Sequence, residues 1–203
     1  MEQLRRLPEA GCGRLVLLGD LFQLWIGDRR YETPDIARVV EELASLRRAG
    51  VRVEYIEGNR DFFLAGSPYA HAFDLVTTEL AFVVGGTRYL AVHGDGLDRR
   101  DWKYRFWRAV SKSAAGRLIG RNIPRRIAGR AVRGTEERLS ATNLEHKRRI
   151  PEEVLREYGA RRLAEGHDVL LLGHFHVERT LEVDGGEVRL IDAWYNSGRI
   201  EWL

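Results

Sequence analysis

The sequence predicts an α/β fold with a parallel sheet, because two buried strands flank one amphipathic helix and a glycine follows each strand. The apolar runs Arg14–Leu18 and Val51–Ile56 have the length and composition of buried strands. Between them, apolar residues recur at helical spacing at Ile36, Val39, Val40, Leu43 and Leu46. A strand, helix, strand order implies a right-handed crossover, which makes the two strands parallel in one sheet.

The helix between these strands has sequence signals at both ends. Thr33 is a good N-cap, Pro34 suits the first helical position, and Asp35 places an acid in the first turn. Gly50 follows the last apolar position. We therefore expect the helix to begin at Pro34 and to end just before Gly50.

Two glycine-centred turns predict β-hairpins further along the chain. Gly85-Gly86-Thr87 and Gly185-Gly186 each separate two runs with strand composition. The four runs are Glu79–Val84, Arg88–Val92, Thr180–Val183 and Val188–Ile191. Asp168–Leu172, which precedes the second hairpin, is expected to be another buried strand.

The chain is long enough, at 203 residues, for one domain with a genuine core, and nothing demands a second independent fold. From Asp101 to about Glu165 the sequence has helical stretches rich in Arg, Leu, Ile and Trp, and no strand pattern. We therefore expect residues 1–98 and 166–203 to form the core. Residues 99–165 are expected to form a helical cap insertion.

Composition limits the location of the chain. No uninterrupted apolar run reaches the roughly 18 residues that a membrane span requires. The first twenty residues lack the apolar segment and the small-residue cleavage site of a signal peptide, so a cytoplasmic location is expected. Cys12 is the only cysteine, which excludes an internal disulfide, and we assign it to packing.

The net charge of +3 is small but unevenly distributed. Between Arg99 and Arg133 there are twelve Lys or Arg residues and one acid, Asp101. Such a concentration suggests an anionic partner, either a phosphate-bearing substrate, an acidic lipid or nucleic acid. A solvated basic helix face is the alternative.

Polar clusters follow four of the predicted strands, at the carboxyl ends where open α/β sheets bind ligands. They are Gly19-Asp20, Gly58-Asn59-Arg60-Asp61, His93-Gly94-Asp95 and Gly173-His174-Phe175-His176. Each cluster alone also fits a structural loop, and the four together favour a functional site. His174 and His176 form the best single ligand pair, because alternate residues project from the same side of an extended segment.

The donor types indicate the metal and the reaction. Asp, Asn and His supply oxygen and nitrogen ligands without a thiolate, which favours Mn²⁺, Fe²⁺ or Zn²⁺ over a soft metal. Two such ions sharing a carboxylate would lower the pKa of a bridging water and neutralise phosphate oxygens. The sequence therefore predicts hydrolysis of a phosphoester or phosphoanhydride.

The series GDLFxxWIGD, GNRDF, HGD and GHxH resembles the calcineurin-like metallophosphoesterases over nearly the whole chain. More narrowly, it resembles the UDP-2,3-diacylglucosamine hydrolases of lipid A biosynthesis, which produce UMP and 2,3-diacylglucosamine 1-phosphate. The resemblance implies a sandwich of mixed β-sheets flanked by helices. Arg60 is a discriminating position, since many relatives of other specificity carry histidine there.

Site roles follow from this resemblance residue by residue. It implies two divalent metals, most simply Mn²⁺ with Fe²⁺ or Zn²⁺ as alternatives, and Asp20 as the bridging carboxylate. Asn59, His93 and His174 would complete one site, and His176 would belong to the other. Arg60 would join these residues in catalysis by meeting a substrate phosphate bidentately. The implied substrate contacts are Asn59, Arg60, Asp101, Tyr104, Arg108, Ser140, Asn143, Lys147 and His174.

One family feature is not found before Gly19. The family begins with a strand ending in Asp-x-His, and no Asp-x-His occurs among the eighteen residues that precede Gly19. One metal site therefore has all four of its ligands, and the other retains Asp20 and His176. Two explanations stay open: the natural protein is longer, or the chain is a truncated, one-metal or inactive relative. Loss of a central strand would expose the backbone groups of its neighbours.

The insertion mixes aromatic and aliphatic residues with its basic ones. A surface of this kind suits an anionic diacyl glycolipid and predicts peripheral contact with the cytoplasmic face of the inner membrane. A helical cap whose aromatics pack on the core is the alternative. The apolar residues are Trp102, Tyr104, Phe106, Trp107, Leu118, Ile119, Ile123 and Ile127.

Two rival functions remain. The first is a phosphoesterase of the same superfamily that acts on a soluble nucleotide or another diphosphate. The second is a nucleic-acid-binding module that uses the basic stretch, but it leaves the four strand-end clusters unexplained, so no nucleic acid partner is expected. The oligomeric state is left open by the sequence.

Overall fold

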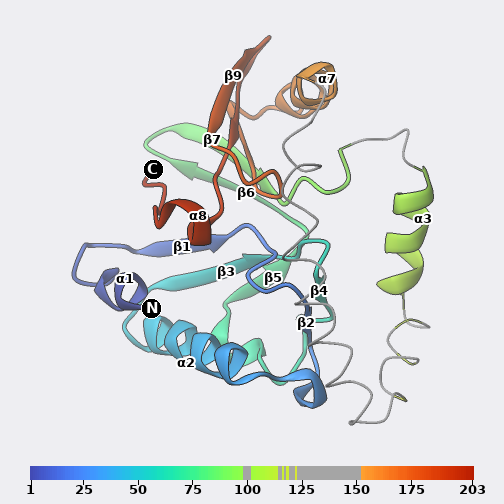
Figure 1. Cartoon of the computed structure of the whole chain (residues 1–203). Coiled ribbons are helices and arrows are strands. Elements are labelled where there is room, and N and C mark those ends of the chain that lie inside the picture. Colours follow the sequence, from blue (N-terminus) through green and yellow to red (C-terminus); the bar gives the residue numbers. More distant parts are fainter. Residues whose placement is uncertain (98–101, 114–115, 117, 119–121, 123–151) are drawn as a thin grey trace.

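The protein is described from a computed structural model that covers residues 1–97, 102–113, 116, 118, 122 and 152–203. These residues form four layers, in which α2 (Pro34–Arg48) covers one sheet, a second sheet lies on the other side, and α7 (Glu152–Leu163) covers the second sheet (Figure 1). This arrangement confirms the predicted fold of mixed sheets flanked by helices.

The first sheet contains three parallel strands in the order β1-β3-β5. They are β1 (Arg14–Leu17), β3 (Arg52–Ile56) and β5 (Leu75–Thr77). Leu15 pairs with Val53 and Leu17 with Tyr55, so both strands run toward the same edge of the sheet. The parallel pairing predicted from the strand, helix, strand order is confirmed.

The second sheet is mixed and has the order β6-β7-β8-β10-β9. Its two antiparallel hairpins, β6 with β7 and β10 with β9, are the predicted ones. The central strands β7, β8 and β10 pair in parallel. The bounds are β6 (Glu79–Val84), β7 (Thr87–Val92), β8 (Val169–Leu172), β9 (Arg179–Val183) and β10 (Gly186–Leu190).

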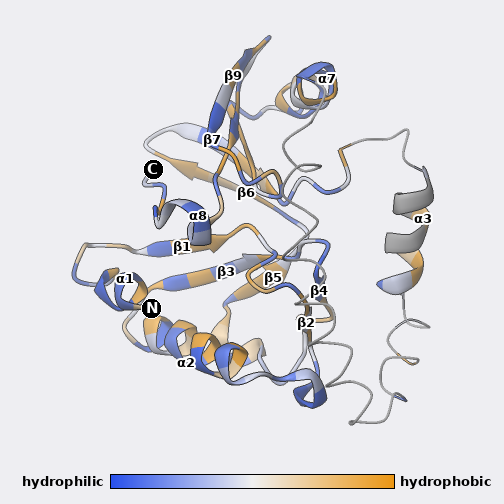
Figure 2. Ribbon diagram, viewed as in Figure 1, coloured by the Kyte–Doolittle hydropathy of each residue, from blue (hydrophilic) through white to orange (hydrophobic). Residues whose placement is uncertain are grey.

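Alternating side chains on the strands fill three apolar layers. Val53 and Tyr55 of β3 face α2, whereas Ile56 contributes to the layer between the two sheets. On β8, Leu170 and Leu172 belong to the layer under α7. Both sheets are therefore covered on both faces, and the central strand β8 consists only of buried apolar residues. Strand β3 carries blue polar segments beside orange apolar ones (Figure 2), because Arg52 and Glu54 alternate with Val53 and Tyr55.

The two covering helices follow simple sequence rules. Thr33 caps α2 as predicted, since its Oγ1 accepts a hydrogen bond from the Ile36 amide at 3.3 Å. Helix α7 lies inside the predicted insertion, yet its buried residues pack on the second sheet. Gly159 permits this close approach, because a Cβ there would lie 2.4 Å from Val188 Cγ2. The division into a core and an insertion stays a prediction.

Several short elements lack a periodic signal and were not predicted. The pair of β2 (Trp25–Ile26) and β4 (Asp61–Phe62) is parallel and joins the loop after β1 to the loop after β3. The other short elements are α1 (Glu2–Arg6), η1 (Arg29–Tyr31), η2 (Ala70–Ala72) and α8 (Trp194–Ser197). Helix α3 (Trp102–Ser111), in contrast, falls in the stretch that the sequence predicts to be helical. Gln3 of α1 bonds Trp194 Nε1 and the Gly198 carbonyl, which brings the two ends of the chain together.

The predicted substrate contacts lie only partly within the described residues. Asp101, Ser140, Asn143 and Lys147 lie outside the described residues. Tyr104 and Arg108 are on α3, but the description of this helix does not extend to their side chains. Among the described helices, none combines the length and hydropathy needed to cross a bilayer.

Candidate metal centre

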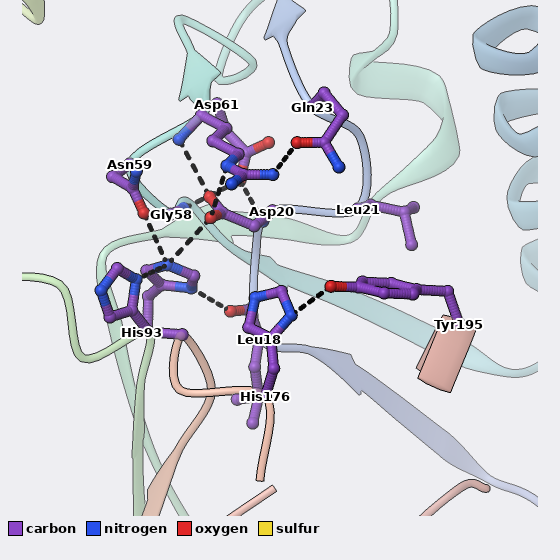
Figure 3. Close-up of polar contacts among 12 residues, drawn as sticks. Leu18, Asp20, Leu21, Gln23, Gly58, Asn59, Asp61, His93, His176 and Tyr195 are labelled. Carbon is purple, nitrogen blue, oxygen red and sulfur yellow. Dashed lines mark hydrogen bonds and ion pairs between the residues drawn. The ribbon is translucent and has the colours of Figure 1, made fainter. Parts of the chain in front are cut away.

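The four predicted polar clusters meet at the carboxyl ends of strands from both sheets. Asp20 follows β1, Asn59 follows β3, and His93 and His174 follow the neighbouring strands β7 and β8. In Figure 3 the side chains of Asp20, Asn59 and His93 point toward one another. Parallel strands end at a common edge, so residues far apart in the sequence converge there.

Three of these residues form a group that can hold a cation. Asp20, His93 and His174 each offer one ligand atom, and these atoms lie within 4.8 Å of one another. His93 Nε2 is 3.1 Å from His174 Nδ1, 3.2 Å from Asn59 Oδ1 and 3.5 Å from Asp20 Oδ2. Asn59 therefore faces the same point as the other three.

The tautomer of His93 and the direction of its pKa shift indicate whether this arrangement of donors favours a positive charge. His93 Nδ1 lies 2.5 Å from the Leu18 carbonyl, which fixes the proton on Nδ1 in the neutral ring. Nε2 then presents a lone pair to the oxygens of Asp20 and Asn59. Burial alone would lower the pKa of His93, but the Asp20 carboxylate outweighs it and leaves the pKa raised. A site that favours a positive charge here, lined by N and O donors, fits a divalent cation.

The backbone around the group is unusual. Asp20, His174 and His176 have positive φ angles of 53°, 58° and 53°. Non-glycine residues rarely adopt this left-handed conformation, and such residues cluster at functional sites. A side chain at position 58 would collide with the Asp20 carboxylate, because a Cβ there would lie 2.3 Å from Asp20 Oδ1.

Asp61 holds the loops after β1 and β3 together. It is fully buried, and its Oδ2 accepts hydrogen bonds from the amides of Asp20 and Gly58, both at 2.8 Å. In return, the Arg60 amide donates to Asp20 Oδ1 at 2.9 Å. Burial, followed by the nearby Asp20 carboxylate, raises the pKa of Asp61 to about 7. The sequence placed Asp61 in a polar cluster without giving it this role.

Arg60 lies beside the group, with its side chain nearly buried. Its Nε is 3.5 Å from Asp20 Oδ2, and Nη1 donates to Gln23 Oε1. The guanidinium is therefore oriented from two sides, which suits its predicted contact with a phosphate. Gln23 was missed by the sequence analysis, although it lies only three residues after Asp20.

His176 is not a member of the three-residue group. Its Nδ1 bonds the hydroxyl of Tyr195 on α8, and the two rings meet edge to face with centroids 5.4 Å apart (Figure 3). Tyr195 was also missed, because the short helix α8 has no pattern in the sequence. The group of possible ligands that the described residues form contains Asp20, His93 and His174, and not His176.

A cation held at this group could polarise a phosphoryl oxygen or activate a water molecule. Arg60 would add a second positive charge next to it. The site therefore combines a group that can hold a cation with a nearly buried guanidinium, and both would stabilise negative charge on a phosphate ester or diphosphate.

Comparisons with known proteins agree with this chemistry. No family model matches the chain. It is 31% identical to a UDP-2,3-diacylglucosamine hydrolase from Stutzerimonas stutzeri, over 87% of this chain and 75% of that protein. It is 31% identical to one from Marinobacter nauticus, over 95% of this chain and 80% of that protein. It is 33% identical to one from Ralstonia nicotianae, over 89% of this chain and 71% of that protein.

Solved structures add only a weak likeness. One described as a novel archaeal phosphodiesterase matches 97% of this chain and 78% of that chain, at 11% identity and a TM-score of 0.47. The curated relatives confirm the resemblance predicted from the sequence, and the chain belongs to the UDP-2,3-diacylglucosamine hydrolase family.

Proposed function

We propose that the chain hydrolyses the diphosphate of UDP-2,3-diacylglucosamine, releasing UMP and 2,3-diacylglucosamine 1-phosphate in lipid A biosynthesis. The relatives named for this activity support the substrate. The observation that carries the proposal is the convergence of Asp20, His93 and His174, with their ligand atoms within 4.8 Å, beside the buried Arg60.

The protein residues would divide the work as follows. Asp20, Asn59, His93 and His174 would hold a divalent cation, which supplies an activated water and neutralises phosphate oxygens. The Arg60 guanidinium would donate hydrogen bonds to the substrate diphosphate, either in place of its bond to Gln23 or beside it. It would thereby stabilise the negative charge that develops on the diphosphate. Hydrolysis adds one water across a P–O bond of the diphosphate, so a hydroxyl joins one phosphorus and the bridging oxygen leaves with the other.

We propose Mn²⁺ as the natural metal, with Fe²⁺ or Zn²⁺ as alternatives, since the donors are carboxylate, amide and imidazole. A second ion would share Asp20 and use His176. The remaining substrate contacts are proposed at Asp101, Tyr104, Arg108, Ser140, Asn143 and Lys147. They would come from the insertion, residues 99–165, acting as a cap.

We also propose peripheral contact with the anionic cytoplasmic face of the inner membrane. Trp102, Phe106 and Val110 are exposed and recur every four residues along α3, so they share one face of this helix. Basic residues surround them in the sequence. Flotation with vesicles containing anionic lipid should carry the protein at low salt and release it at high salt. Absence of binding at low salt contradicts the membrane contact.

The enzymatic proposal is tested with two substrates and one metal. Purified protein with Mn²⁺ should cleave UDP-2,3-diacylglucosamine, and EDTA should abolish this cleavage. Bis(p-nitrophenyl) phosphate, a soluble diester, should be turned over far more slowly. Cleavage of the soluble diester without cleavage of the lipid would favour the alternative of another phosphoesterase specificity.

A further inference from the structure

Lys112 connects the helix α3 to the loop that carries Asn59 and Arg60. It follows the last residue of α3, and its Nζ donates to the Gly58 carbonyl at 2.6 Å. The same ammonium lies 3.9 Å from Glu57 Oε2 and 5.7 Å from the centroid of the Phe62 ring. Its side chain is only 14% exposed, so this lysine is packed against the metal centre and does not extend into solvent.

A lysine this buried needs favourable partners, because transfer of an ammonium group from water is costly. The Gly58 carbonyl and the Glu57 carboxylate provide them. Glu57 is itself anchored, since its Oε1 accepts a hydrogen bond from the Leu64 amide at 2.8 Å. The contacts of Lys112 thus join the end of α3 to the loop that begins at Glu57.

The position of Gly58 gives this contact its importance. The Gly58 amide donates to Asp61 Oδ2 at 2.8 Å, and the Gly58 carbonyl accepts from Lys112. That carbonyl belongs to the same planar peptide group as the amide of Asn59. Lys112 therefore fixes the plane from which the Asn59 side chain extends toward His93.

We propose that Lys112 is a positioning residue for the metal centre, which couples α3 to the loop of residues 57–61. Its ammonium holds this loop in the conformation that presents Asn59 to the cation and Arg60 to the substrate. The catalytic part of this proposal rests on the proposed function, whereas its structural and metal-binding parts do not.

The central variant is Lys112→Met, which keeps the length of the side chain and removes the charge and the donors. Mn²⁺ affinity, measured by titration and electron paramagnetic resonance, should fall about tenfold, as for other groups that orient metal ligands. Lys112→Arg keeps donors and a positive charge, so it should restore most of the affinity. Arg38→Met, which removes one exposed charge on α2, is the control and should leave the affinity unchanged.

Hydrogen exchange of the metal-free protein provides a readout that needs neither metal nor substrate. Residues 57–62 should exchange faster in Lys112→Met than in the wild type, and at the wild-type rate in Arg38→Met. Equal exchange and equal Mn²⁺ affinity in the two methionine variants would overturn the proposal. So would a lowered melting temperature with unchanged affinity, because this combination indicates a purely structural lysine.

Activity separates this proposal from the proposed function. Lys112→Met should lose kcat for UDP-2,3-diacylglucosamine at limiting Mn²⁺ and regain much of it at saturating Mn²⁺. If the wild type does not cleave this substrate, the proposed function fails while the affinity and exchange results still decide the role of Lys112.

Discussion

The two sheets contribute to the metal centre in different ways. Strands β1 and β3 of the first sheet end in loops that are tied to each other by Asp61, by the Arg60 amide and by the β2–β4 pair. Strands β7 and β8 of the second sheet supply imidazoles, and His93 reaches across to the Leu18 carbonyl of the first sheet. The first sheet therefore builds an oxygen-rich, hydrogen-bonded half of the candidate site, and the second sheet adds imidazole nitrogens to it.

This difference predicts that substitutions in the two halves of the site change different properties. Those in the first half should change both the stability of the fold and cation binding, and those in the second half mainly cation binding. Polar residues of the first half are parts of the hydrogen-bonded loops as well as proposed ligands, so their loss should affect both properties. In the second half, His174 Nδ1 lies 3.1 Å from His93 Nε2, another member of the group, so the loss of His174 should affect the cation more than the fold.

The largest effect is expected at Asp20, which belongs to the first half and to the proposed metal site. Asp20→Asn keeps the acceptor for the Arg60 amide and removes the negative charge, so kcat/KM should fall about 10³-fold. Asp35→Asn, an exposed carboxylate on α2, should leave kcat/KM unchanged. Steady-state kinetics with UDP-2,3-diacylglucosamine measures both, and a loss below tenfold for Asp20→Asn would contradict its place at the cation.

Unfolding experiments test the hydrogen bonds of the first half directly. Asp61→Ala leaves the amides of Asp20 and Gly58 without their buried acceptor, so the free energy of unfolding of the metal-free protein should fall by about 2 kcal/mol. His174→Ala should lower it by less than about 1 kcal/mol, while abolishing Mn²⁺ binding. Urea denaturation compares the two variants. Equal destabilisation would show that the halves do not differ in the way we infer.

The smallest effect is expected at a surface contact far from the centre, where β7 meets the start of β8. Hydrogen bonds from Arg88 lower the pKa of Asp168 to about 2. Because the pKa is lower in the folded protein, this pair stabilises the fold above pH about 4, the usual value for an aspartate, and the stabilisation is lost as the pH falls toward 2.

Asp168→Asn should therefore flatten the pH dependence of stability between pH about 4 and 2, and change stability slightly at neutral pH, since exposed ion pairs contribute little. Thermal unfolding across this pH range is the measurement. An unchanged slope in the variant would exclude Asp168 as the titrating group.

The sequence predicted which residues lie close together where the ends of strands determine their positions. Asp20, Asn59, His93 and His174 each follow a buried strand, and parallel strands place their ends at one edge. Contacts between loops left no such signal. Asp61 lies on β4, and Gln23 lies just before β2. These two strands pair over only two residues each, which is too short to show periodicity in the sequence.

The same limit applies to the outer layers. The helical pattern around Glu152–Leu163 was recognised, but helical spacing does not say against which surface a helix packs. The predicted hairpin of β9 and β10 was confirmed, but not the position of β10 between β8 and β9. Parallel pairing with β8 depends on contacts between distant segments, which no local pattern encodes.

The left-handed backbone at Asp20 and His174, two members of the three-residue group, has a consequence for how an ion would enter. Each such residue costs about 1–3 kcal/mol, and the chain meets this cost when it folds. An arriving ion then finds donors already aimed, and binding requires little rearrangement of the loops. Selection for tighter ion binding and selection for a more stable apoprotein would thus act in opposite directions on these two positions.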